Sequence, residues 1–129
     1  MSRILLIEDD PGVASLLQRI LVGAGYVVVE AGNGKAGLAS YFEQPTDLVI
    51  TDIVMPDIEG LEVIRALRRH DARVKIIAMS GGGVGEANIY LDMARNFEAR
   101  WVLNRPFSKS GVLAVVAEAL ASPATIATP

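Results

Sequence analysis

The sequence has no cysteine and only one histidine, His70. Without thiols the chain can form neither a disulfide framework nor a thiolate metal site. The cysteine and histidine ligands that zinc prefers are therefore missing. His70 stands beside arginines at the end of a predicted helix, and we expect it to be a solvated surface residue.

Long apolar runs and an excess of positive charge are also lacking. The run at residues 4–7 is too short for a signal-peptide core, and no run approaches the roughly 18 residues of a membrane span. A net charge of -3 gives no general attraction for nucleic acid. We therefore expect a cytoplasmic protein that binds neither membranes nor nucleic acid directly.

A nucleotide-binding loop is absent as well. The glycine-rich stretch at residues 81–85 is not followed by the Lys-Ser/Thr pair of a phosphate-binding P-loop. Because glycine permits large backbone changes, this stretch is better interpreted as a flexible switch loop.

What is present is the pattern of one α/β domain. The chain has 129 residues, of which 51% are hydrophobic and 21% charged, as in an ordinary globular domain. Short apolar runs predict strands over 4–7, 26–30, 48–52, 74–79 and 101–103. Helical spacing predicts helices over 11–23, 34–42, 61–69, 84–97 and 109–120, with Asp10, Asn33 and Ser108 as N-caps. We expect residues 1–121 to form the domain and 122–129 a flexible C-terminal tail.

Strands that alternate with helices predict a parallel sheet, because short parallel connections need helical crossovers. The natural candidate is a doubly wound five-stranded sheet of flavodoxin-like order 2-1-3-4-5 with helices on both faces. On the predicted third helix, Arg65, Arg68 and Arg69 should lie on the solvated face.

Polar residues follow the predicted strands, at the edge where ligands bind in such sheets. The first strand is followed by Glu8 and Asp9, the third ends in Asp52, the fourth precedes Ser80 and the fifth precedes Arg105. Clustered carboxylates repel one another unless a cation neutralises them, and Mg²⁺ prefers oxygen ligands. With the metal bound, Asp52 can act as a nucleophile toward phosphorus, while Ser80 and Arg105 share the charge of the phosphoryl group.

Over residues 3–121 the sequence resembles the receiver domains of two-component response regulators. The matching stretches are residues 4–10, 47–56, Gly60, 79–81 and 105–107. By this resemblance, Glu8 and Asp9 form the acidic pair of a Mg²⁺ pocket, and Asp52 is the phosphoacceptor. Val54 would give its backbone carbonyl to the metal, and the Ser80 hydroxyl would bond a phosphoryl oxygen.

Two positions depart from the family pattern. Arg105 stands where the family nearly always has lysine, and a planar guanidinium is larger than an ammonium group. Val102 occupies a position that usually carries an aromatic residue, which swings inward on switching. Trp101 is one residue away and should point to the opposite face of its strand.

The resemblance implies partners and a role. A sensor histidine kinase or phosphotransfer protein would donate the phosphoryl group. A downstream protein would bind the face of helix 84–97, strand 101–103 and the last helix. We expect no conventional enzyme, although the domain would assist its own phosphorylation and dephosphorylation.

Two alternatives stay open at this point. A receiver-like interaction module with weak or no phosphorylation is favoured by the unusual Arg105 and Val102. A flavodoxin-like cofactor enzyme is disfavoured, because the acids at residues 8–10 would repel a cofactor phosphate in the first loop.

Overall fold

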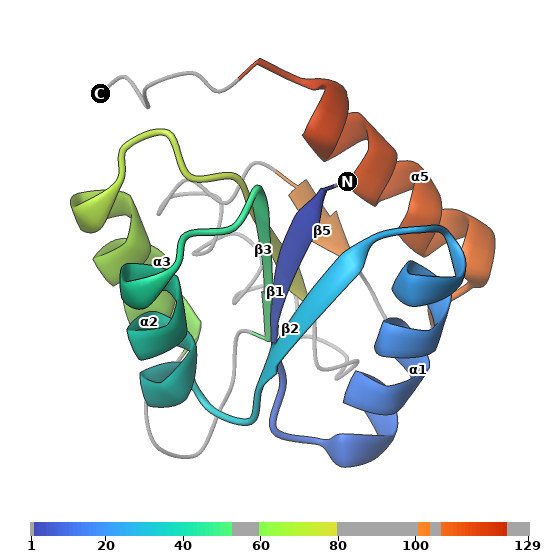
Figure 1. The fold of residues 1–129 in the computed structure, drawn as a ribbon, viewed down its shortest axis with the longest axis horizontal. Coiled ribbons are helices and arrows are strands. Elements are labelled where there is room, and N and C mark those ends of the chain that lie inside the picture. Colours follow the sequence, from blue (N-terminus) through green and yellow to red (C-terminus); the bar gives the residue numbers. More distant parts are fainter. Residues whose placement is uncertain (1, 53–59, 80–100, 104–106, 124–129) are drawn as a thin grey trace, which may run out of the picture.

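The computed structural model describes residues 2–52, 60–79, 101–103 and 107–123. Their strands form one parallel sheet in the order β2-β1-β3-β4-β5 (Figure 1). The predicted order 2-1-3-4-5 is therefore confirmed. The strands are β1 (Arg3–Ile7), β2 (Val27–Ala31), β3 (Leu48–Asp52), β4 (Ile76–Met79) and β5 (Trp101–Leu103).

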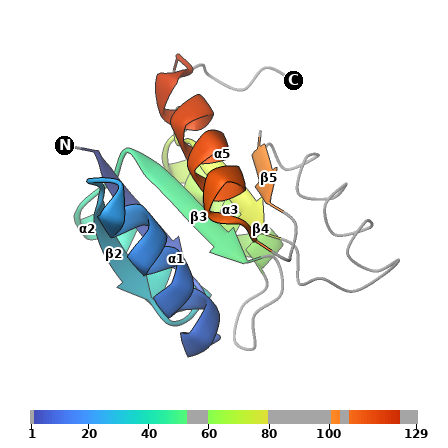
Figure 2. The ribbon, with the colours of Figure 1, turned by 90° about the vertical axis from the view of Figure 1, so that its right-hand side faces the viewer.

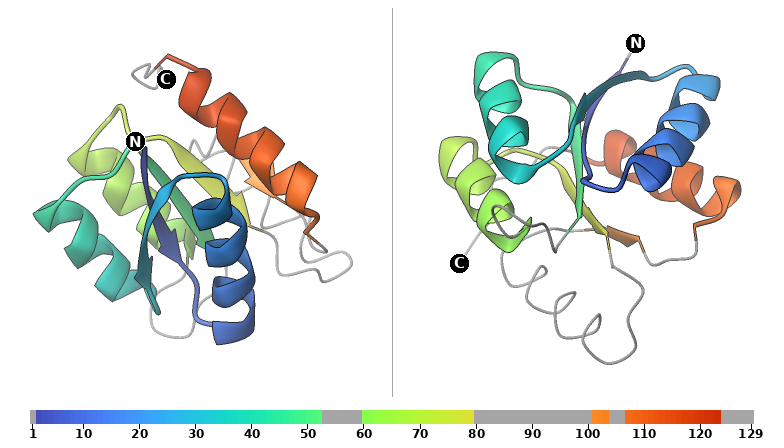
Figure 3. Two further views of the ribbon diagram at one scale, coloured as in Figure 1. Left: turned by 45° about the vertical axis from the view of Figure 1, so that its right-hand side comes forward. Right: turned by 90° about the horizontal axis from the view of Figure 1, so that it is seen from below.

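Helices cover both faces of this sheet. They are α1 (Pro11–Gly23), α2 (Gly34–Glu43), α3 (Gly60–His70) and α5 (Lys109–Ala121). Figure 2 shows the sheet between these layers, and Figure 3 shows α2 and α3 on one side with α1 and α5 on the other. The helix predicted over 84–97 lies outside the described residues. None of the helices in the described part of the chain is long and apolar enough to span a bilayer.

The core is split by the sheet into two clusters. On β1, Leu5 and Ile7 face the α2 and α3 side, whereas Ile4 and Leu6 face the α1 and α5 side. All four side chains are at most 1% exposed. A strand buried on both faces needs a continuous apolar run, which explains why the alternation of a half-exposed strand is missing from this sequence.

Three of the described helices, α1, α2 and α5, begin at a predicted cap. The carboxylate of Asp10 accepts hydrogen bonds of 2.8 and 3.3 Å from two backbone N–H groups of α1. Asn33 and Ser108 each accept one from the first turn of α2 and α5, at 2.7 and 3.0 Å. These three predictions are confirmed, and each cap satisfies backbone N–H groups that the first turn of its helix leaves unpaired.

Strand boundaries differ by one or two residues from the predicted ones. β4 begins at Ile76 rather than at 74, because the Val74 N–H donates to Asp71 in a turn after α3. β2 begins at Val27, because the Tyr26 N–H donates to the Leu21 carbonyl at the end of α1. In both cases a residue with strand-like character donates its backbone N–H to the end of the preceding helix or to the turn directly after it, and so lies outside the strand.

A lysine fastens the opposite edge of the sheet. The Nζ atom of Lys75, just before β4, donates to the carbonyl oxygens of Leu120 and Ser122 at 3.2 and 2.6 Å. These carbonyls belong to the end of α5, where the helix itself supplies no donors. The contact therefore joins the last turn of α5 to the start of β4.

Gly37 marks the closest approach of α2 to the sheet and leads to the first prediction. A Cβ atom at this position would lie 2.4 Å from Cδ1 of Ile7, whereas one at Gly23 would meet nothing within 4 Å. We expect Gly37→Ala to lower the free energy of unfolding by about 1–3 kcal/mol, because α2 must move away from β1. Urea denaturation measures the effect. Gly23→Ala is the matched control, and an equal response of both variants would contradict this packing.

Tyr41 gives a prediction about alkaline pH. Its hydroxyl is buried and donates a 3.0 Å hydrogen bond to Asp71. Burial raises the pKa of Tyr41 above its ordinary value of 10.0, and the bond to Asp71 raises that pKa further. The folded state therefore retains this proton when the unfolded state loses it. The stabilisation is complete below pH 10 and is lost as the pH rises above it.

The free energy of unfolding should accordingly fall more steeply above about pH 10 in the native chain than in Tyr41→Phe, which has no phenolic proton to lose. Urea titrations at several alkaline pH values compare the two proteins. Parallel pH profiles would show that the Tyr41 proton makes no such contribution.

Candidate functional site

The carboxyl ends of β1 and β3 bring three acids together. The two strands pair in register, with Ile7 beside Thr51, so that the residues that follow them are neighbours. Glu8, Asp9 and Asp52 each offer a carboxylate oxygen that lies within 4.8 Å of the other two. The predicted convergence of these acids is confirmed.

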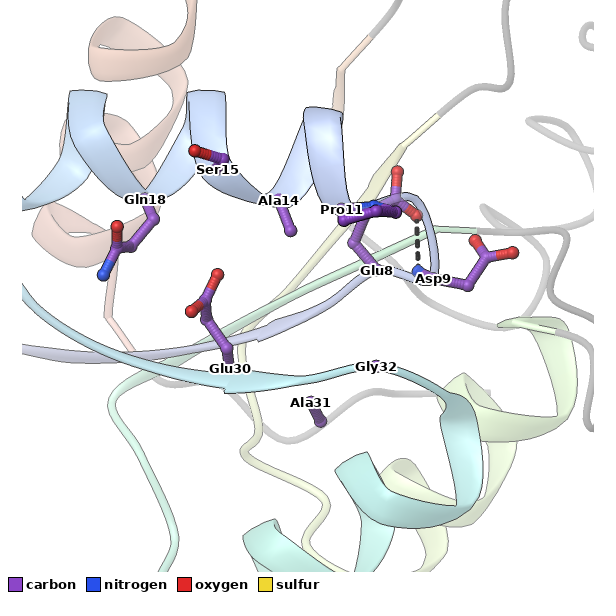
Figure 4. A pocket seen from close by; sticks show the side chains of 9 residues that line it. All are labelled: Glu8, Asp9, Pro11, Ala14, Ser15, Gln18, Glu30, Ala31 and Gly32. Carbon is purple, nitrogen blue, oxygen red and sulfur yellow. Dashed lines mark hydrogen bonds between the residues drawn. The ribbon is translucent and has the colours of Figure 1, made fainter.

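The three carboxylates differ in their access to solvent. Glu8 and Asp52 are only 3% and 5% exposed, whereas Asp9 is exposed. The Asp9 N–H donates a 3.0 Å hydrogen bond to the Glu8 carboxylate, which fixes the turn between them (Figure 4). Thr51 is fully buried and donates to the Asp52 backbone carbonyl at 3.0 Å. The sheet therefore holds the buried Glu8 and Asp52 in place, whereas the Asp9 side of the cluster is open to solvent.

A hollow of about 410 Å³ lies beside this cluster, between α1 and the end of β2 (Figure 4). Glu8 and Asp9 form one end of its lining. Ser15 and Gln18 of α1 line it together with Glu30 of β2. Glu30 is not among the site residues predicted from the sequence, although a charged residue inside an otherwise apolar strand was the available signal.

The donor set of the cluster suits one kind of metal. All three ligand atoms are carboxylate oxygens, which hard divalent cations prefer over the nitrogen and sulfur ligands of zinc. Two of the acids are buried, and their mutual repulsion favours a bound cation. The described residues thus fit a divalent, oxygen-coordinated ion.

Three predicted site residues cannot be placed in this geometry. Val54, Ser80 and Arg105 lie outside the described residues, so their proposed roles toward metal and phosphoryl group stay predictions. The same holds for most of the predicted partner face, because helix 84–97 is also outside the described part.

On β5 the predicted alternation is confirmed. Val102 packs against the core cluster on the α2 and α3 side, and Trp101 packs against the cluster on the α1 and α5 side. Both side chains are half-buried. Trp101 thus lies on the opposite face of the sheet and cannot take the place of an aromatic residue at position 102 unless the two faces of β5 are exchanged.

Comparison with known proteins agrees with this geometry. Residues 4–117 match the family model of the response regulator receiver domain. The chain is 36% identical over 107 residues to the response regulator receiver protein CpdR of Brucella abortus, covering 83% of this chain and 87% of that protein. It is 32% identical over 119 residues to the chemotaxis protein CheY of Bacillus subtilis, covering 92% of this chain and 97% of that protein.

Solved structures show the same architecture. The response regulator protein TrrA of Thermotoga maritima, in complex with Mg²⁺-BeF, has a TM-score of 0.80 at 30% identity and covers 92% of this chain and 99% of its own. A CheY-like receiver domain protein from Methanospirillum hungatei has a TM-score of 0.83 at 27% identity, with 93% and 94% covered.

Close packing of the three acids leads to a prediction about stability. Without divalent cations, Asp52→Asn should raise the free energy of unfolding by about 1–2 kcal/mol, because it removes one of the repelling buried charges. Urea denaturation at low ionic strength with a chelator measures this. Asp10→Asn is the control, since asparagine keeps the cap while a charge outside the cluster is removed. A destabilised Asp52→Asn protein would contradict the repulsion.

Proposed function

The chain belongs to the response regulator receiver domain family, and we propose that it accepts a phosphoryl group on Asp52. The donor is the phosphohistidine of a sensor histidine kinase or of a phosphotransfer protein. The observation that carries this proposal is the position of Asp52: its carboxylate ends a fully buried strand and lies within 4.8 Å of oxygens from Glu8 and Asp9.

In the proposed transfer, a carboxylate oxygen of Asp52 attacks the phosphorus atom. The bond between phosphorus and the histidine nitrogen breaks, its electron pair stays on the imidazole, and that nitrogen takes up a proton. The product is a mixed anhydride at Asp52. Burial of Asp52 at the end of β3 orients its carboxylate for this attack.

We propose Mg²⁺ as the cofactor, held by Glu8, Asp9, Asp52 and the backbone carbonyl of Val54. When bound, the ion offsets negative charge on the phosphoryl oxygens. The all-oxygen donor set supports this choice. The Mg²⁺-BeF complex of TrrA supports it as well, since that protein is 30% identical to this chain.

Ser80 and Arg105 are proposed to contact the phosphoryl group from the ends of β4 and β5. The Ser80 hydroxyl would donate to one of its oxygens. Arg105 would contribute positive charge in a geometry that differs from that of lysine, because its donors form a planar fork. Phosphorylation would then switch the face of helix 84–97, β5 and α5 toward a downstream protein.

The proposal also covers the compartment, the absence of direct binding to nucleic acid or membrane, and the class of reaction. The exchange takes place in the cytoplasm, without direct binding of nucleic acid or membrane. The chain is not a conventional enzyme, since the group that it helps to transfer and to hydrolyse is its own aspartyl phosphate.

One observation favours a second candidate, an interaction module that signals with weak or no phosphorylation. Val102 is short, branched at Cβ and packed against the core cluster. A branched side chain has few rotamers, so it cannot perform the swing of an aromatic ring at this position. In this second candidate a partner protein binds without any swing of an aromatic ring at position 102.

Incubation with acetyl phosphate and Mg²⁺ tests the two candidates. We expect the native chain to gain the mass of one acid-labile phosphoryl group and Asp52→Asn to gain none, because an amide cannot act as the nucleophile. Intact-mass spectrometry with and without a chelator measures both. Asp10→Asn should be labelled like the native chain.

Labelling that persists in Asp52→Asn would move the acceptor to another residue. A native chain that stays unlabelled with acetyl phosphate and with a phosphorylated histidine protein would overturn the phosphoacceptor function and favour the interaction module.

A further inference from the structure

Positive charge is concentrated at the end of α3, although the chain as a whole carries a net charge of -3. Four of its 12 lysines and arginines lie within residues 65–73. Of these, Arg65, Arg69 and Arg73 are exposed, as is the neighbouring His70. We call these four residues, together with Phe42 of α2, the α3 basic face.

The helical period produces this arrangement. Val63, Ile64 and Leu67 are fully buried in the core cluster, so α3 is fixed against the sheet by one side. Arg65 and Arg69 are four residues apart and project from the opposite side. The predicted solvated face is confirmed for these two arginines, whereas Arg68, predicted on the same face, is half-buried and donates to the Ala72 carbonyl at 2.8 Å.

Two of these charges, on Arg69 and Arg73, are not neutralised locally. Within the described part of the chain, the guanidinium groups of Arg69 and Arg73 form no hydrogen bond or ion pair. The nearest acid in sequence is Asp71, and its carboxylate already accepts from the Tyr41 hydroxyl at 3.0 Å and from the Arg73 backbone N–H at 2.9 Å. Both guanidinium groups are therefore available to carboxylates of another molecule.

An exposed aromatic residue lies beside these charges. Phe42 is 44% exposed, and its ring centroid is 4.4 Å from that of His70. His70 also meets the Tyr41 ring edge-on, at 6.3 Å between centroids. The prediction that His70 is a solvated surface residue is confirmed, since it is exposed, and its ring also packs on two aromatic rings. These contacts hold an apolar surface in a fixed orientation next to arginines, the combination that is enriched at protein interfaces.

A hollow continues the surface. It has a volume of about 280 Å³, and its charged lining residues are Asp47, Asp71, Arg73 and Lys75, with Tyr41 beside them. The Tyr41 ring forms part of its wall and also touches His70, so the hollow and the exposed Phe42 are joined through these two rings.

The α3 basic face is remote from the candidate phosphorylation site. α3 lies on the sheet face opposite to α1 and α5 (Figure 3). Its last residue, His70, precedes β4 and is therefore near the edge where the strands begin, whereas Asp52 ends β3 at the other edge. A partner on α3 leaves Asp52, α1 and α5 accessible.

We propose that the α3 basic face binds an acidic segment of a partner protein. Carboxylates of that segment pair with Arg69 and Arg73, and an apolar side chain covers Phe42. A protein segment fits better than nucleic acid, because a dense row of phosphates would be repelled by the acidic remainder of the chain. The inference rests on the surface alone and does not depend on phosphorylation of Asp52.

The test is a titration of the full chain, followed by amide chemical shifts, with a synthetic peptide of glutamates around a central leucine. We expect saturable shifts confined to the end of α2 and to residues 65–73. Affinity should fall severalfold between about 0.05 and about 0.3 M salt, since exposed charges are screened over this range. A glutamine version of the peptide and a short DNA duplex are titrated in parallel.

Charge reversal provides the matched variants. Arg69→Glu with Arg73→Glu should weaken peptide binding at least about tenfold, while Arg19→Glu on the exposed side of α1 should leave it unchanged. Arg69→Gln with Arg73→Gln, which adds no new charge, should weaken it by a smaller factor. Phe42→Ala should reduce the advantage of the leucine-containing peptide over an all-glutamate one.

Several results would overturn the proposal. These are the absence of saturable shifts in the native chain, equal affinity of the native chain and the Arg69 and Arg73 variants, and tighter binding of the duplex than of the peptide. Asp52→Asn should bind the peptide like the native chain, so that a failure of the phosphoacceptor function is distinguished from a failure of this one.

Discussion

Mutual repulsion of Glu8, Asp9 and Asp52 is the constraint around which this structure is organised. Oxygens of the three carboxylates lie within 4.8 Å of one another, and two of the acids are almost completely buried. Such an arrangement is unfavourable by itself. It persists because residues 4–7 of β1 and all of β3 are buried and the two strands pair in register, so that the sheet fixes the acids at their ends.

Much of the fold could be predicted because its local signals agree with its packing. Asp10, Asn33 and Ser108 cap the helices that they were expected to cap, and the alternation of strands and helices indicated the doubly wound parallel sheet whose order is observed. The errors occurred at Tyr26 and Val74, where a helix end competes with a strand for the same residue. The local residue pattern does not show whether the hydrogen bond to the helix end or the one to the strand is the more stable.

The candidate site was predictable for a related reason. In a parallel sheet all strands end at one edge, so Glu8, Asp9 and Asp52 had to meet. The contacts that could not be predicted join residues far apart in sequence and on different helices. The packing of His70 on Phe42 depends on how α2 and α3 lie side by side, which no local period encodes. Glu30 was missed because its role depends on a hollow formed with α1.

The Lys75 contact fixes the C-terminal end of α5, which is the point about which this helix would tilt. Two carbonyls at the end of this helix are bound to the start of β4, whereas its first turn is held by a cap and lies at the edge that carries the acids. A helix of 13 residues is about 20 Å long, so a tilt of about 3° around the fixed end displaces the other end by roughly 1 Å. A tilt of α5 about this end would therefore move its first turn most, at the edge of the sheet that carries the acids, and the point where the chain leaves the helix least.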